Sequence, residues 1–156
     1  MGSRVVLAGF VFWFGVPLTS GTTVADEYVQ WKMVDYAIDQ PLGGLKGDAR
    51  RGRQLVRDRS KGNCLACHRM PIPEEEFHGT VGPSLHGISS RLSEGQIRLR
   101  VVDEKQLNPA SIMPGYYRHP RHFNRVAESW QGKTVLNAQE VEDIVAYLLT
   151  LKDEQP

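Results

Sequence analysis

With 156 residues, the chain is long enough for one domain and an extension, because single domains commonly run to about 100–150 residues. Its 19 basic and 18 acidic residues leave a formal charge of +1, so the composition gives no reason to expect nucleic-acid binding. No internal repeat is visible.

The first 25 residues have the three-part layout of a secretory signal. Arg4 is their only charge, an apolar run covers residues 5–18, and small and polar residues lead to Ala25. The 14-residue run is shorter than the roughly 20 residues needed to span a bilayer, so we predict cleavage after Ala25, with an uncleaved anchor as the alternative. Cleavage would lower the formal charge to 0, and export would place the mature protein outside the cytoplasm, in the periplasm.

Residues 26–46 are predicted to form an N-terminal extension. Its apolar side chains recur at mixed spacings: Tyr28, Trp31, Met33, Val34, Tyr36 and Ile38. Turn formers at Pro41, Gly43 and Gly44 then suggest a linker. Two interpretations stand, a partner-binding arm and a local lid on the same domain.

Asp48 can cap a helix predicted over residues 49–58. Gly52 costs this helix about 1 kcal/mol relative to Ala, which is acceptable where a missing side chain lets another helix approach closely. Residues 46–61 hold seven basic side chains and residues 137–156 hold five acidic ones. We interpret them as complementary, solvated faces of two surface helices, with a docking patch as the alternative.

Cys64-Leu65-Ala66-Cys67-His68 has the attachment pattern of a c-type haem. Two thiols on one short turn can bond the vinyl groups of a porphyrin, and the next residue is carried under the iron as proximal ligand. A thioredoxin-like pair needs no trailing histidine, and a zinc site needs a second ligand pair that only lone histidines could supply. We therefore predict one haem c, bound covalently to Cys64 and Cys67 with His68 on the iron.

A loop is predicted after the haem motif, and its three adjacent glutamates, residues 74–76, are more simply a solvated surface than a metal site. The stretch Gly82-Pro83-Ser84-Leu85-His86-Gly87 follows. The Pro83 carbonyl can accept a hydrogen bond from the second ring nitrogen of His68. Such a bond fixes a ligand imidazole and makes it a stronger ligand.

An irregular stretch, residues 107–117, follows a second helix predicted over residues 94–103. It holds Met113, whose thioether we predict as the sixth ligand of the iron. A thioether raises the haem potential relative to a second imidazole. His119 and His122 follow closely enough to be alternative ligands.

The last predicted element is the strongest helix. Asn137 and Glu140 form a capping-box pattern, and the helix is expected to run to about residue 152. Apolar residues follow at spacings of three and four: Val141, Ile144, Val145, Leu148 and Leu149. We expect this face to pack on the Gly52 helix and the haem edge, and with no strand pattern the chain is predicted to be all-α.

Three separated features resemble the class I cytochrome c family: the Gly52 helix before the haem motif, the 82–87 loop, and Met113-Pro114 before a terminal amphipathic helix. Over residues 47–152 the chain is also similar to SoxX, the mono-haem subunits of the SoxAX complexes of bacterial thiosulfate oxidation. The matching stretches are residues 62–68, 77–85, 108–114, 125–126 and 139–148. One departure is Val56, where many class I cytochromes have an aromatic residue, and it implies a different packing of the helix pair.

The resemblance implies a class I cytochrome c domain at residues 47–153, after a signal peptide (1–25) and an extension (26–46). It implies a SoxA-type cytochrome partner whose haem carries the chemistry, in a heterodimeric L-cysteine S-thiosulfotransferase that couples thiosulfate to a cysteine of the carrier SoxYZ. This chain would pass electrons to a soluble acceptor such as a small cytochrome c, and would not be catalytic alone. Arg91 lies where many relatives have an arginine near a haem propionate. A free periplasmic electron carrier is the alternative function.

Overall fold

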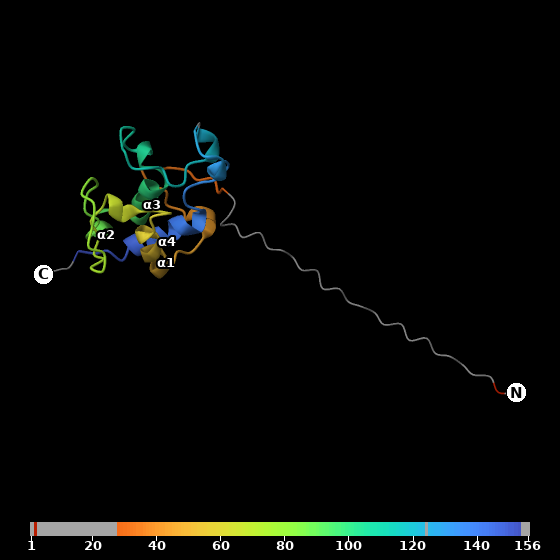
Figure 1. Ribbon diagram of the computed structural model, residues 1–156, viewed down its shortest axis with the longest axis horizontal. Coiled ribbons are helices and arrows are strands. Elements are labelled where there is room, and N and C mark those ends of the chain that lie inside the picture. The colour runs from red at the N-terminus through yellow and green to blue at the C-terminus, as the bar shows by residue number, and fades with distance from the viewer. Residues whose placement is uncertain (1, 3–27, 124, 154–156) are drawn as a thin grey trace.

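The computed structural model describes residues 2, 28–123 and 125–153, and this part of the chain is helical with no strand beyond one isolated bridge. Its α-helices are α1 (Ala49–Arg57), α2 (Ile88–Arg91), α3 (Glu94–Asp103) and α4 (Ala138–Leu148), joined by long loops with short 3₁₀ turns (Figure 1). The helices predicted at 49–58, 94–103 and from 137 onward are confirmed, whereas α2 was not predicted. Apart from residue 2, the predicted signal peptide (1–25) lies outside the described residues. Within the described part, no helix combines the length and apolarity needed to cross a bilayer.

Caps fix where the helices begin. The Asp48 carboxylate accepts from the backbone N–H groups of Arg50 and Arg51, as predicted. The predicted capping box of Asn137 and Glu140 is present, with both bonds at 2.9 Å. α4 is shorter than predicted, because the backbone tightens after Leu148 into turns that end the helix.

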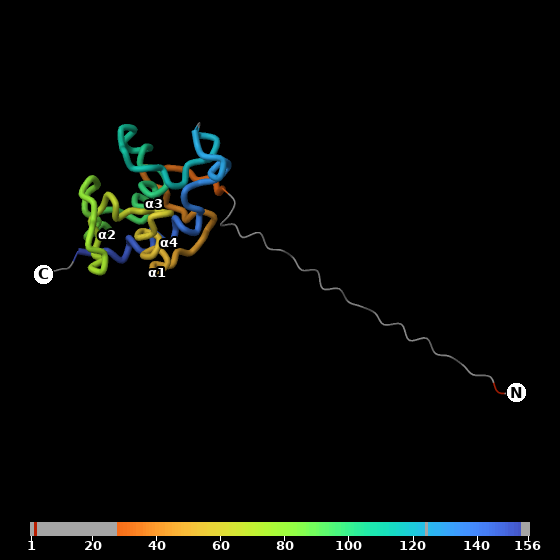
Figure 2. The backbone as a smooth tube through the Cα atoms, viewed as in Figure 1, coloured from red at the N-terminus to blue at the C-terminus, as the bar shows by residue number. Residues whose placement is uncertain are grey.

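α1 and α4 form the main helix pair, lying together in Figures 1 and 2. They meet at Gly52, where an added Cβ would overlap the Asp143 carbonyl oxygen and lie 2.8 Å from the Tyr147 Cβ. The close approach predicted at Gly52 is therefore confirmed. Val56, the departure from the class I pattern, is completely buried in the same core.

The basic and acidic segments do complement each other. Arg51 pairs with Asp143 at 2.7 Å, and Lys61 pairs with Glu140 at 2.8 Å. The prediction that the acidic face is solvated is wrong for Glu142 and Asp143, which are 3% and 2% exposed. These carboxylates point toward packed elements and accept hydrogen bonds there, which offsets the cost of their burial.

Glu142 joins three elements through one buried ion pair. Its partner is Arg98 of α3, completely buried, with the guanidinium Nε 2.9 Å from Oε1. Oε1 also accepts from the backbone N–H of Leu42 at 2.9 Å, and Arg98 donates to the Ile38 carbonyl at 2.7 Å. The N-terminal extension is thereby tied to both α3 and α4.

The described part of the extension lies on its own domain. Its trace runs alongside α3 before reaching α1 (Figure 2), and the Ile38 N–H donates to the Gly95 carbonyl at 3.0 Å. Ile38 and Leu42 are buried in the core, while Tyr36 is 67% exposed at the tip of a tight turn. These contacts are those expected of a local lid.

Candidate haem site

The haem motif lies on a short 3₁₀ turn, Cys64–Ala66, that follows α1. The turn begins after Asn63, whose positive φ of 46° reverses the chain direction. The N–H groups of Cys67 and His68 both donate to the Cys64 carbonyl, at 3.1 and 2.9 Å, and Leu65 is buried beneath the turn. Both sulfur atoms lie half-buried on this one turn, as thioether bonds to a single porphyrin require.

His68 is oriented by the loop predicted to hold it. Its Nδ1 lies 2.7 Å from the Pro83 carbonyl oxygen. Because a carbonyl can only accept, Nδ1 carries the proton, and the lone pair of Nε2 is left for a metal. The sequence reasoning missed Gly82: a Cβ there would lie 2.6 Å from Nδ1 and 2.7 Å from Nε2, so the ring packs directly against the Gly82 backbone.

Backbone hydrogen bonds hold this loop against the haem motif. Gly79 donates to the Leu65 carbonyl at 2.7 Å, and Gly82 donates to the Cys67 carbonyl at 2.9 Å. Arg91 of α2 also bonds to this loop. Its guanidinium donates to the carbonyls of His86 and Ser84, at 2.6 and 3.1 Å. The structure thus places Arg91 at the 82–87 loop, and each terminal nitrogen of its guanidinium donates to one of these carbonyls.

Met113 lies half-buried on the segment between α3 and Tyr117. Its N–H donates to the Ser111 hydroxyl at 3.2 Å. The alternative ligands have other contacts. The His119 ring packs edge-on against Tyr28, with centroids 4.5 Å apart, and its Nδ1 accepts from the Arg121 N–H at 3.2 Å.

Met70 and His78, a sulfur and an imidazole group near the motif, also have contacts of their own. Met70 is only 2% exposed and belongs to the hydrophobic core. His78 accepts from the Met70 N–H through Nδ1 at 3.2 Å. Among the described residues no cluster of three or more His, Cys, Asp or Glu side chains is placed to hold a metal ion.

Burial dominates the electrostatics around the first cysteine. Desolvation raises the pKa of the Cys64 thiol to about 12, so the thiol is neutral near pH 7. Burial also raises the pKa of Tyr116, whose hydroxyl donates to the Gly62 carbonyl at 2.8 Å. Sequence reasoning missed Tyr116. A neutral, half-buried Cys64 thiol and a His68 Nε2 without a hydrogen-bond partner fit a covalently bound porphyrin.

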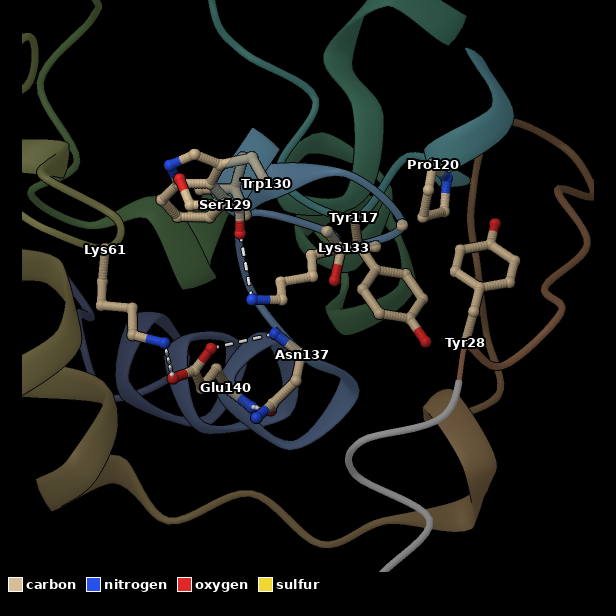
Figure 3. A pocket seen from close by; sticks show the side chains of 12 residues that line it. Tyr28, Lys61, Tyr117, Pro120, Ser129, Trp130, Lys133, Asn137 and Glu140 are labelled. Carbon is tan, nitrogen blue, oxygen red and sulfur yellow. Dashed lines mark hydrogen bonds and ion pairs between the residues drawn. The ribbon is translucent and has the colours of Figure 1, made fainter. Parts of the chain in front are cut away.

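A separate cavity of about 650 Å³ opens at the N-terminus of α4 (Figure 3). Lys61 and Glu140 form an ion pair on its wall, and the Lys133 ammonium donates to the Ser129 carbonyl at 3.0 Å. Trp130 and Tyr28 line it as well. The cavity includes none of the predicted haem residues, and both of its lysines have partners.

Comparison with known proteins agrees with this geometry. The cytochrome c family profile matches residues 49–152. The cytochrome c-553-like protein of Synechocystis sp. is 34% identical over 107 residues, covering 69% of this chain and 72% of that protein. A chain in the crystal structure of SoxXA from P. pantotrophus superposes with a TM-score of 0.71 and 34% identity, covering 79% of this chain and 95% of that one.

These relationships confirm the predicted class I cytochrome c fold and the predicted haem c, since the family carries this cofactor covalently and Cys64 and Cys67 are suitably spaced. Similarity to cytochromes c also supports an electron-transfer role. The chain belongs to the cytochrome c family, and within it the chain is similar to SoxX-type cytochromes.

Proposed function

We propose that this cytochrome is the electron-transfer subunit of a periplasmic SoxAX-type complex that couples thiosulfate to a cysteine of a SoxYZ-type carrier. The main support is the fold and 34% identity shared with a chain of SoxXA over nearly the whole length of that chain. The partner would be a SoxA-type cytochrome, and a small soluble cytochrome would accept the electrons. The signal-like residues 1–25 support export to the periplasm.

Haem c, when bound, supplies an iron that exchanges one electron at a time. Cys64 and Cys67 would tether it, and His68 would bind the iron through Nε2. The bond from Nδ1 to the Pro83 carbonyl makes this imidazole a stronger and better oriented ligand. The Met113 thioether would be the second protein ligand of the iron. An iron bound by both residues would offer no position to substrate, which suits a relay rather than a catalyst.

The number of cysteines indicates which subunit would carry the thiosulfate chemistry. Cys64 and Cys67 are the only cysteines in the sequence, and the haem uses both. This chain therefore has no thiol on which substrate sulfur could be trapped. Thiosulfate chemistry is assigned to the partner subunit, and the isolated chain is expected not to turn over thiosulfate.

The axial assignment is tested by Met113→Ala in the haem-loaded protein. We expect loss of the weak red charge-transfer band of sulfur-ligated ferric haem, a high-spin or ligand-substituted spectrum, and a lower reduction potential. His119→Ala and His122→Ala serve as controls and should change none of these. A native spectrum in Met113→Ala together with an altered one in His119→Ala would establish bis-histidine ligation instead.

A free electron carrier is the second candidate function. It is favoured by the cytochrome c-553-like relative and by the extension, which packs on its own domain from Tyr28 onward. Co-purification distinguishes the two. The subunit proposal requires a second cytochrome to accompany the tagged chain through size-exclusion chromatography, and thiosulfate-dependent reduction only in that complex. Thiosulfate turnover by the isolated chain would contradict the subunit proposal.

A further inference from the structure

The segment that carries Met113 is a loop whose two ends meet at the C-terminus of α3. It leaves the helix after Asp103 through a 3₁₀ turn, Glu104–Gln106, and returns at Tyr117. The Tyr117 N–H donates to the Val102 carbonyl at 3.0 Å, which closes the loop at its base.

The side chain of Asp103 lies at this base and bonds to both limbs. On the outgoing limb its carboxylate accepts from the Lys105 N–H at 3.3 Å and from the Gln106 side-chain amide at 2.9 Å. On the returning limb it pairs with the Arg118 guanidinium at 3.3 Å. Asp103 is 1% exposed, so these partners are what offsets the cost of burying its charge.

Gly115 brings the returning limb close enough for this arrangement. A Cβ at this position would lie 2.8 Å from Asp103 Oδ1 and 2.5 Å from the Arg118 Cγ. The limb therefore passes directly over the carboxylate, two residues after Met113. Farther out, the Lys105 ammonium donates to the Ser111 carbonyl, while the Ser111 hydroxyl accepts from Met113. Asp103 and the outer contacts are connected through Lys105.

We propose that Asp103 is a positioning residue for the distal ligand: its carboxylate clamps the base of the 104–117 loop and keeps Met113 on the haem iron. This rests on the proposed axial role of Met113. An added ligand can bind the iron only while the Met113 thioether is displaced. The apparent affinity of that ligand therefore measures the fraction of molecules in which the loop is open.

The test is Asp103→Asn in the full, haem-loaded chain, with imidazole as the probe. Asparagine keeps the size of the side chain but loses the charge, which weakens each hydrogen bond and the pair with Arg118. We expect the red charge-transfer band to persist without imidazole, and the apparent affinity of ferric haem for imidazole to rise about tenfold. Unfolding in guanidinium is followed in parallel.

Asp143→Asn is the matched control. Asp143 is also buried, at 2% exposed, and also bonds several donors, among them Arg51 and the Asp48 N–H, but none of them lies on the Met113 loop. This variant should lose unfolding stability without a change in imidazole affinity. A general loosening of the fold would instead raise the affinity in both variants and would overturn the positioning role.

Arg118→Gln provides a milder variant should Asp103→Asn fail to accumulate. Arg118 is 32% exposed and contributes only the returning limb of the clamp, so a smaller increase in the same direction is expected. If Met113→Ala abolishes the red band while Asp103→Asn and Arg118→Gln bind imidazole like the wild type, Met113 is the ligand and the clamp is wrong. If Met113→Ala leaves the band unchanged, both the axial assignment and the clamp are wrong.

Discussion

Gly52→Ala should destabilise the protein even though alanine is the better helix former. Propensity alone favours the substitution by about 1 kcal/mol. The new methyl group, however, would overlap the carbonyl oxygen of Asp143 and lie 2.8 Å from the Tyr147 Cβ. A backbone carbonyl cannot rotate away as a flexible side chain can, so α1 and α4 must separate.

The magnitude follows from comparing the two effects. Overpacking of this kind costs about 3 kcal/mol at the upper end of its usual range, and a gap of about 0.5–1 Å forfeits a quarter to a half of the dispersion energy of the contacts it opens. After subtracting the gain in propensity, we expect a net loss of about 2 kcal/mol. With a guanidinium slope of about 4 kcal/mol per molar, the unfolding midpoint should fall by about 0.5 M.

The assay is equilibrium unfolding of the haem-loaded protein, monitored by circular dichroism. Gln54→Ala, an exposed position on the same helix, is the control and should change stability by less than about 0.5 kcal/mol. An unchanged or higher midpoint for Gly52→Ala would mean that the helices tolerate a side chain there, and the close-contact explanation would be wrong.

Three further predictions use the same unfolding assay. Arg98→Met should cost about 3–5 kcal/mol by leaving the buried Glu142 carboxylate without its guanidinium, whereas Glu142→Leu should cost less because Glu94 still pairs with Arg98. The double variant should lose less than the sum of the two, and additive losses would refute the coupling. Ile38→Ala should cost about 2–5 kcal/mol and Tyr36→Ala almost nothing, whereas equal effects would refute packing of the extension on the domain. Hydrogen bonding from the Arg50 N–H lowers the pKa of Asp48, so its charge should stabilise the fold above about pH 4 and cease to do so as the pH falls through the lowered pKa. The stability difference between the wild type and Asp48→Asn should therefore disappear in acid, and a pH-independent difference would contradict this.

Local signals in the sequence were sufficient to predict α1, α3, α4 and the haem motif. The cap at Asp48 and the capping box at Asn137 each involve residues no more than three positions apart, so they can be recognised from the sequence without knowledge of the fold. The spacing of Cys64 and Cys67 is local in the same way. The signal peptide and the iron ligands His68 and Met113 remain predictions, since they concern residues or a cofactor outside the described structure.

Contacts between distant segments were decided by the tertiary structure alone. The burial of Glu142 depends on Arg98, 44 residues away, and on Leu42, 100 residues away. An acidic residue on an acidic helix looks solvated until these partners are known. Asp103 likewise looks like an ordinary helix-terminal carboxylate, and its clamp exists only because the chain returns at Arg118. Caps and haem spacing depend on neighbours along the chain, whereas burial and pairing depend on which segments folding brings together.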